Sequence, residues 1–492
     1  MVVRRLCSRT TAAPISVSPT NALCGAVLQR RRHARHAFAL ALLSCTVAGC
    51  VNLPHVDQLQ AQRERVSVAT ESGRLSYGQS QAIVARVAGS PEGKDFLERH
   101  LEVEEAISKT PLVAGNSVKL LADGPSTYRS MLEAIAGAQD FLHMETYIFD
   151  DDDIGNMFAD ALIERRQAGV DVALMVDAVG TVGTSDAVFA RMRDAGVNVK
   201  IFNPVNPLRN PFGWSPNERS HRKLLVIDGQ VGFVGGINVS GVYRSSSFGS
   251  KGVKRDQQAR EDAPWRDTHV CIAGPAVAEI ERVFVEGWRS QVGPPITERQ
   301  RLAPAARAGD EVVRILSNEP GAEDNYEVYL TLMSAFQSAR QSIFITMAYF
   351  VPDPAFIQAL REAARRGVEV VLVLPGFSDS SLVLQAGRSH YGDLLEAGVQ
   401  IYERGDALLH AKTAVVDGVW STVGSSNMDW RSFTLNHEIN AVIVGSSFGT
   451  QMENLFRIDR AAAAAVDLPQ WEDRGIKNRF MEFLGRMVER AL

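Results

Sequence analysis

One stretch of this chain occurs twice, and this duplication limits the possible folds more than any other feature. In both copies Lys stands two residues after His, Asp seven, Gly fourteen and Asn seventeen. The shared positions are His221, Lys223, Asp228, Gly235 and Asn238 in the first copy and His410, Lys412, Asp417, Gly424 and Asn427 in the second. A single HxKxxxxD pattern is a weak signal, but two copies with the same downstream Gly and Asn indicate a duplicated structural unit.

The chain around each copy repeats as well. Residues 167–172 match residues 365–370, and residues 194–197 match residues 396–399. Within each repeat, helical patterns end at Gly169 and Gly367 and are followed by near-continuous apolar strands, which is typical of a sheet covered on both faces. The sequence therefore predicts an α/β protein with two similar domains, each a mixed β-sheet flanked by helices, packed about a pseudo-twofold axis.

The predicted segments follow from these repeats and from shifts in composition. They are a signal peptide (1–50), a tether with N-terminal helices (51–114), a first domain (115–292), a Pro- and Ala-rich linker (293–311), a second domain (312–470) and a C-terminal amphipathic helix (471–492). The helix pattern of the tail allows two interpretations: a helix that lies in a membrane surface, or a helix that packs onto its own domain. The Pro-rich loop at residues 203–216 is either a lid or membrane-touching loop, because its Trp favours a membrane interface, or a packed surface loop.

Each motif lies on a predicted strand. Residues 224–227 and 414–416 are apolar and largely β-branched, and an Asp-Gly turn signal follows in both copies. Because side chains alternate along a strand, His and Lys two residues apart project from one face. Asp228 and Asp417 have the opposite parity and fall at the turn, so we keep them with the catalytic motif only in a supporting role.

Two such sets suit phosphoryl transfer. A neutral imidazole is a competent nucleophile near neutral pH, and a second imidazole can protonate the leaving alkoxide. Lysine ammonium groups and asparagine amides neutralise and hold phosphate oxygens. Neither HExxH nor CxxC occurs, so we predict no metal and no cofactor. The acidic run at residues 150–153 is more typical of a solvated loop than of a cation site.

Composition excludes several protein classes. A length of 492 residues favours two domains, and a net charge of −5 argues against a nucleic-acid partner. Four of the five cysteines lie within the first 50 residues, which excludes a disulfide framework in the body of the protein. We interpret Cys271, on a strand-like run, as a small buried apolar residue.

The N-terminus has the layout of a targeting segment. A basic block at residues 30–35 precedes an apolar run at 37–49 that closes as Val-Ala-Gly-Cys. This ending resembles a bacterial lipoprotein box, which implies that Cys50 is lipidated and anchors the protein to the membrane of the cell envelope, facing the periplasm. An uncleaved, membrane-associated leader is the alternative.

Beyond the motifs, residues 145–149, 349–352, 408–410, 424–432 and 435–438 resemble the phospholipase D superfamily, and within it the bacterial cardiolipin synthases. The resemblance covers residues 115–470. It implies that both domains contribute to one site, where His221 attacks phosphorus and forms a phosphohistidine. His410 then protonates the leaving alcohol and later deprotonates the acceptor.

The resemblance also implies roles for the remaining site residues. Phosphate binding is expected from Lys223, Asn238, Lys412, Ser425 and Asn427. Asp267 is expected to orient the imidazole of the first half, and Glu438 that of the second. The first copy has Gly236 in place of Ser425, so it lacks this hydroxyl.

The implied substrates are phospholipids, with phosphatidylglycerol as the acceptor at a membrane surface. The main alternative is a hydrolytic phospholipase D, which uses water as the acceptor and releases phosphatidic acid. A nuclease of the same superfamily and a non-catalytic lipid-binding protein are further alternatives. Both intact His-Lys pairs argue against the non-catalytic one.

Overall fold

The computed structural model of the chain describes residues 53–54, 59–206, 215, 217–245, 263–296, 304–320 and 326–489. The predicted signal peptide with Cys50 and most of the loop at 203–216 therefore lie outside the described residues. Within the described part of the chain, no helix has both the length and the apolar character that a membrane span requires.

The first half is built around a mixed sheet. Its strands run in the spatial order β6, β5, β4, β8, β9, β11 and β3, with the β4–β5 and β5–β6 pairs parallel and the others antiparallel. Its elements are β3 (Leu112–Leu121), α4 (Gly124–Ala136), β4 (Phe141–Thr146), α5 (Asp153–Gln167), β5 (Asp171–Asp177), α6 (Asp186–Asp194), β6 (Asn198–Phe202), β7 (Arg219–Ser220), β8 (Leu224–Ile227), β9 (Val231–Gly235), η3 (Gly241–Tyr243), β10 (Trp265–Arg266), β11 (His269–Ala273) and α8 (Val277–Ser290).

The second half repeats this sheet in the order β12, β21, β19, β18, β13, β15 and β16, again with two parallel pairs at the far end. Its elements are β12 (Glu311–Asn318), α9 (Glu327–Ser338), β13 (Ser342–Met347), β14 (Phe350–Val351), α10 (Pro354–Arg365), β15 (Glu369–Pro375), α11 (Ser381–Arg388), α12 (Tyr391–Glu396), β16 (Gln400–Arg404), β17 (Leu408–Leu409), β18 (Lys412–Val416), β19 (Trp420–Gly424), β20 (Met428–Asp429), α13 (Trp430–Thr434), β21 (Asn436–Val444), α14 (Ser446–Ala461), β22 (Ala463–Val466), α15 (Leu468–Glu472) and α16 (Ile476–Met487).

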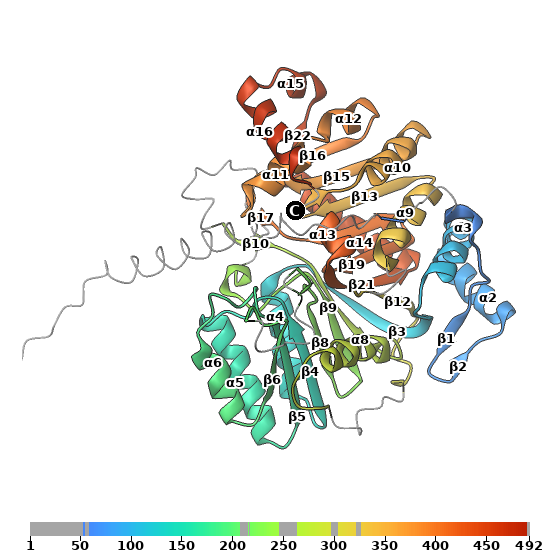
Figure 1. The fold of residues 1–492 in the computed structure, drawn as a ribbon. Helices are drawn as coiled ribbons and strands as arrows, with labels where there is room; N and C mark the ends of the chain where they lie inside the picture. Colours follow the sequence, from blue (N-terminus) through green and yellow to red (C-terminus); the bar gives the residue numbers. More distant parts are fainter. Residues whose placement is uncertain are drawn as a thin grey trace, which may run out of the picture. The chain divides into compact units, whose positions relative to one another are not determined.

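The two sheets join edge to edge. Strand β3 pairs antiparallel with β12, so the strand order reads as a palindrome about this junction. Figure 1 shows α4, α5 and α6 on one face of the first sheet and α8 on the other. Val283 and Phe284 of α8 share a buried core with Ile439 of β21 and with Phe448 and Met452 of α14, so the halves also pack through this layer. The predicted duplication is thus present as two equivalent sheets.

The N-terminal segment is more ordered than the predicted tether. Its elements are η1 (Leu59–Ala61), β1 (Val68–Thr70), β2 (Gly73–Arg74), α2 (Tyr77–Ala88) and α3 (Pro91–Ile107). The two helices match the sequence prediction, whereas the β1–β2 hairpin and the pairing of β1 with β3 were missed. Phe96 and Leu97 of α3 lie in the same core as Phe336 of α9, which fixes this segment against the second half.

Two further sequence predictions concern the acidic run at residues 150–153 and Cys271. Asp152 of the acidic run accepts hydrogen bonds from the amides of Ile154 and Gly155 at the start of α5 and from Gly241 N at 2.5 Å, so it serves as a helix cap. Cys271 is a free, half-buried thiol on β11, and burial raises its pKa to about 11.

Candidate active site

Two very short strands deliver the motif histidines to the junction of the halves. Strand β7, just before His221, pairs in parallel with the start of β21 from the second half, and His221 N donates to His437 O at 2.9 Å. Strand β17, just before His410, pairs in parallel with β10 from the first half, and His410 N donates to Arg266 O at 2.7 Å. Each histidine is therefore held against a strand of the opposite half.

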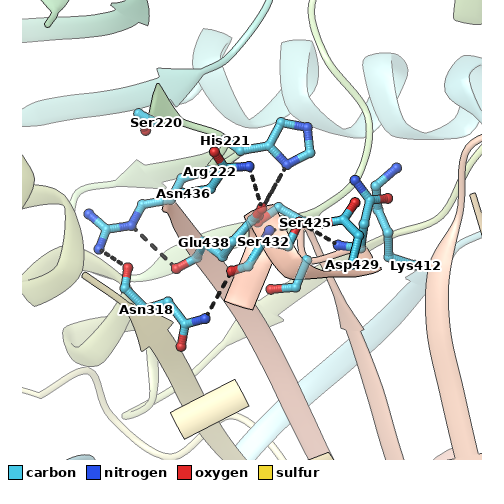
Figure 2. A network of polar contacts seen from close by, with 12 residues as sticks. Ser220, His221, Arg222, Asn318, Lys412, Ser425, Asp429, Ser432, Asn436 and Glu438 are labelled. Atoms are coloured by element: carbon cyan, nitrogen blue, oxygen red, sulfur yellow. Dashed lines mark hydrogen bonds and ion pairs between the residues drawn. The ribbon is translucent and has the colours of Figure 1, made fainter. Parts of the chain in front are cut away.

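This pairing places each imidazole on a carboxylate from the other half. His221 Nδ1 donates to Glu438 Oε1 and Oε2 at 3.0 and 3.1 Å. His410 Nδ1 donates to Asp267 Oδ2 at 2.6 Å. A carboxylate only accepts when it is ionised, so these bonds favour the tautomer with its proton on Nδ1 and a lone pair on Nε2. Figure 2 shows the His221 ring directed at Glu438.

The sequence prediction of these pairs is corrected here. Asp267 was expected to orient the imidazole of the first half and Glu438 that of the second, and the structure exchanges them. The reason is the strand pairing: β7 adds to β21 next to Glu438, and β17 adds to β10 next to Asp267. The two carboxylates remain equivalent, because the amides of Gly236 and Ser425 donate to Thr268 O and Ile439 O, one residue beyond each carboxylate.

Ser425, which was predicted to bind phosphate, is engaged differently. Its hydroxyl donates to Glu438 Oε2 at 2.5 Å and accepts from Ile439 N at 3.0 Å, because the end of β19 lies beside β21. At the equivalent position of the first half, a Cβ on Gly236 would lie 2.3 Å from Asp267 Oδ1. The hydroxyl missing from the first copy is therefore a space requirement of Asp267 and not a lost phosphate contact.

Both motif lysines lie beside their histidines. Lys223 Nζ donates to His221 O at 2.5 Å, and Lys412 Nζ donates to His410 O and lies 3.0 Å from His410 Nδ1. Lys223 and Lys412 are each only 1% exposed. In each half the Lys therefore lies beside its own His, as the period-two alternation along a strand predicts.

The two asparagines differ in how fully they are engaged. Asn238 Oδ1 accepts from Ile148 N at 3.1 Å and from Thr146 Oγ1 at 3.4 Å. Asn427 Oδ1 is buried, and no donor among the described residues reaches it. Because a buried acceptor without a partner is costly, Asn427 Oδ1 is available to accept a hydrogen bond from a bound group.

The motif aspartates lie at the other end of their strands. Asp228 accepts from the backbone amides of residues 139, 140 and 141 at 2.8 to 2.9 Å, and Asp417 accepts from those of residues 340, 341 and 342 at 2.8 to 3.2 Å. Asp228 is five residues from Lys223, which is roughly 16 Å along an extended strand. These side chains therefore fix the turns at the starts of β4 and β13. They lie too far from the histidines to contact them, which agrees with the predicted supporting role.

Burial dominates the electrostatics of the site. Burial lowers the pKa of His221 to about 4, although Glu438 acts in the opposite direction, and it also lowers the pKa of His410 well below its usual range. Burial lowers the pKa of Lys223 to about 7 and that of Lys412 to about 8. Both imidazoles are therefore neutral near pH 7, where Lys223 is partly protonated and Lys412 is mostly protonated. An anion that enters the site favours the charged form of both lysines.

The two carboxylates differ in proton affinity. Burial raises the pKa of Asp267 above its ordinary value. Burial would do the same to Glu438, but the His221 imidazole and its hydrogen bond lower the Glu438 pKa overall. Hence the Asp267 carboxyl holds a proton more readily than the Glu438 carboxyl.

Aromatic residues that the sequence analysis did not select enclose the imidazoles. Tyr147 packs edge-on against His221 at 5.2 Å between ring centroids and lies under the Lys223 ammonium at 5.3 Å. Trp265 lies 5.0 Å from His410, and Tyr243 OH is 3.2 Å from His410 Nδ1. Tyr147 occurs within a stretch that carried the family resemblance, so it had a signal. Tyr243 and Trp265 follow no spacing rule.

Within the ranges that the structure describes, no three His, Cys, Asp or Glu side chains form a cluster that would hold a metal ion. Cofactor-free chemistry stays a prediction from the residue types.

Comparisons with known proteins point in one direction. The profile of a family described as "Cardiolipin synthase, PLD-like domain" matches residues 131–246 and 332–460, so it matches once in each half. The cardiolipin synthase of Alkalihalophilus pseudofirmus is 34% identical over 393 residues, covering 78% of this chain and 74% of that protein. The cardiolipin synthase of Geobacillus thermodenitrificans is 34% identical over 440 residues, covering 88% of this chain and 83% of that protein.

Among solved structures, the phosphatidylserine synthase of Haemophilus influenzae superimposes with a TM-score of 0.59 at 15% identity, covering 79% of this chain and 99% of that one. At this identity the similarity establishes a shared fold.

Proposed function

The chain belongs to the cardiolipin synthase family of phospholipase D-like phosphatidyltransferases, and we propose that it transfers a phosphatidyl group from one phospholipid to a hydroxyl of phosphatidylglycerol. The observation that carries this proposal is the pair of buried imidazoles, each with Nδ1 committed to a carboxylate of the opposite half and Nε2 left for chemistry. A transferase needs one nucleophile and one proton carrier at the same phosphorus, and this arrangement supplies both.

We assign His221 as the nucleophile. Its Nε2 attacks phosphorus, and the bond from phosphorus to the oxygen of the leaving alcohol breaks. The low pKa of His221 keeps its lone pair free near pH 7, and the ionised Glu438 stabilises the positive charge that forms on the ring. The product of this half-reaction is a phosphatidyl group bonded to His221.

His410 acts as the acid and then as the base. To act as the acid, the Asp267–His410 pair takes up one proton when the substrate anion enters, so that one proton lies between Asp267 Oδ2 and His410 Nδ1 and a second lies on Nε2. The raised pKa of Asp267 supports this uptake, and His410 delivers the Nε2 proton to the leaving alkoxide. In the second half-reaction His410 accepts the proton of the acceptor hydroxyl, whose oxygen attacks phosphorus and releases His221. The proton count closes over the cycle.

The phosphate oxygens are held by Lys223, Lys412, Asn238 and Asn427. The two ammonium groups now donate to the carbonyl oxygens of their own histidines, and they turn to the phosphate when substrate enters. Ser425 acts one step away, as the donor that holds Glu438 in place.

The test is a product assay with labelled phosphatidylglycerol in mixed micelles. We expect cardiolipin and free glycerol from the wild-type protein and neither from His221→Ala. Phosphatidic acid without cardiolipin would instead identify a hydrolase. The covalent intermediate is tested by trapping label in acid-labile, alkali-stable linkage on the peptide that contains His221. Label on the His410 peptide would reverse the two roles.

We also propose that the leader attaches the protein to the cell-envelope membrane through a lipid on Cys50. The support is the basic block, the apolar run and the Val-Ala-Gly-Cys ending. Metabolic labelling with a radioactive fatty acid tests this: incorporation is expected in the wild type and lost in Cys50→Ser. Incorporation that persists in Cys50→Ser contradicts the site.

A further inference from the structure

The C-terminal helix α16 presents its apolar face to solvent. Ile476, Phe480, Phe483 and Met487 are 87%, 57%, 58% and 69% exposed. Successive residues of an α-helix step by about 100°, so these four positions fall within an arc of about 60°. They form one continuous stripe, which we call the α16 stripe. An exposed stripe of large apolar side chains marks a binding surface.

The helix packs on its domain through the opposite side. Gly485 lies against α11, where a Cβ would be 2.5 Å from Ala386 N. Glu482 is buried and accepts from Arg474 at 2.7 to 3.0 Å, and Glu489 Oε2 lies 3.2 Å from His390 Nε2. The orientation is thus set by a glycine and by ion pairs, and it directs the stripe outward. The helix thus packs onto its own domain, as one of the two interpretations in the sequence analysis expects, but it does so without burying its apolar face.

Basic residues flank the stripe on both sides. On the helical wheel Lys477 follows it on one side, and Arg479 and Arg486 border it on the other. All three are exposed, whereas Glu482, the acidic residue within α16, faces the packed side. An apolar stripe between two basic borders is the pattern of a helix that lies in the plane of an anionic membrane surface.

The helix is coupled to the second half of the site through close backbone contacts. α11, against which α16 packs, also contacts β14, where a Cβ on Gly387 would be 2.5 Å from Phe350 O. Strand β14 pairs with β20, which begins directly after Asn427. Figure 1 shows α16 beside α11 in the second half. A surface bound by α16 therefore has a fixed orientation relative to Asn427.

We propose that α16 is the membrane-docking element of this protein: the α16 stripe inserts into the interface of a bilayer, and Lys477, Arg479 and Arg486 bind its anionic head groups. The choice of a lipid surface as the occupant rests on the proposed function, because a phosphatidyltransferase must draw its substrates from a bilayer. Docking through α16 holds the active site at the membrane surface.

The experiment measures docking separately from catalysis. Hydrogen exchange of the full chain carrying Cys50→Ser is followed with and without vesicles of phosphatidylglycerol and phosphatidylcholine. We expect vesicles to slow exchange several-fold in the peptide 476–487 and to leave α10 unchanged as an internal reference. The double variant Phe480→Ser with Phe483→Ser should lower the bound fraction in vesicle sedimentation about tenfold. The pair Met157→Ser with Ile458→Ser, at comparably exposed apolar positions, should leave it unchanged.

Two further variants sharpen the result. Phe480→Leu with Phe483→Leu should retain binding, and Lys477→Glu with Arg486→Glu should abolish the preference for anionic vesicles. Unchanged exchange in 476–487 while the protein is bound overturns the proposal. Protection of residues 476–487 in the absence of vesicles also overturns the proposal. If that protection rises with protein concentration, a second copy of the chain covers the stripe; if it does not, the stripe is covered within one chain. Docking without cardiolipin production would refute the proposed function alone, and cardiolipin production with no α16 protection would refute the docking alone.

Discussion

Replacing Glu438 by Gln tests the exchange of carboxylates between the halves. Glu438 accepts from three side-chain donors: His221 Nδ1 at 3.0 and 3.1 Å, Ser425 Oγ at 2.5 Å and Asn436 Nδ2 at 3.4 Å. A glutamine offers one oxygen and one NH₂ group in the same space. When the NH₂ group faces Nδ1, the imidazole must move its proton to Nε2 and loses the lone pair that attacks phosphorus.

The magnitude follows from this loss. The equivalent change in a serine-protease triad, where a carboxylate that orients a histidine becomes an amide, lowers kcat about 10⁴-fold. Here the Ser425 hydroxyl can instead accept from the NH₂ group, which allows part of the population to keep the productive tautomer. We therefore expect Glu438→Gln to slow formation of the phosphatidyl-enzyme by about 10³- to 10⁴-fold, equivalent to about 4 to 5.5 kcal/mol.

The assay is single-turnover release of nitrophenol from a phosphodiester whose leaving group needs no acid. Glu438→Gln should be as defective as His221→Ala on this substrate. The matched control Asp267→Asn, which alters the other pair, should stay within about tenfold of the wild type, as should His410→Ala. On phosphatidylglycerol all four variants should be defective. The opposite pattern on the nitrophenyl substrate would make His410 the nucleophile.

The pairing itself is tested by combining variants. Adding Glu438→Gln to His221→Ala should cost little more than His221→Ala alone, because both changes remove one function. Adding it to His410→Ala should multiply the two defects on phosphatidylglycerol. Multiplicative defects with His221→Ala and none with His410→Ala would refute the exchange and restore the pairing within each half.

The remaining predictions concern the lysines, a glycine and a buried ion pair. Burial lowers the pKa of Lys223 to about 7 and that of Lys412 to about 8, and only a protonated lysine attracts phosphate. Inhibition by inorganic phosphate should therefore be strongest below pH 7 and weaken as the pH rises from 7 to 8. Lys223→Arg, which does not titrate in this range, should remove the lower step of that profile, and an unchanged profile would contradict the assignment. Gly236→Ala places a Cβ 2.3 Å from Asp267 Oδ1, so it should lower the turnover of phosphatidylglycerol about tenfold or more, whereas Gly392→Ala, with nothing within 4 Å, should not. Asp459 accepts from Arg266 at 2.7 and 2.9 Å and from Arg404 at 2.5 Å, and the three side chains are buried. Asp459→Asn should therefore lower the free energy of unfolding by about 3 to 5 kcal/mol in denaturant titrations. The exposed Asp160–Arg191 pair is the control, where Asp160→Asn should cost about 1 kcal/mol or less.

Sequence patterns were sufficient where side-chain periodicity carries the information. The strand predicted at residues 224–227 coincides with β8, and that at 414–416 lies within β18. Period-two alternation placed each Lys beside its His and placed Asp228 and Asp417 at the turns. The repeated helix–glycine–strand units gave the two equivalent sheets. In each case the relevant contacts lie within a few residues along the chain or follow from alternation alone.

Sequence patterns failed where the decisive contact is distant and short. β7 and β17 contain two residues each, too few to show any period, and β7 pairs with a strand more than 200 residues away. Nothing local distinguishes a carboxylate that serves its own half from one that serves the other. Likewise, the amphipathic pattern of residues 476–488 locates an apolar stripe but not its direction. The direction depends on Gly485 against α11 and on Glu482 with Arg474.

The local differences between the two half-sites account for the unequal roles that we propose for them. The carboxylate of each half orients the histidine of the other half, so neither half alone contains a complete His-carboxylate pair. Either imidazole is therefore oriented only when the two halves are packed together. The pairs are not identical, however. Glu438 is steadied by the Ser425 hydroxyl, whereas Gly236 leaves only enough space for the shorter Asp267, which burial makes more basic. This difference of one methylene and one hydroxyl favours a proton on the Asp267–His410 pair and a free lone pair on His221. A duplicated fold can thereby support a reaction that needs an acid on one side of phosphorus and a nucleophile on the other.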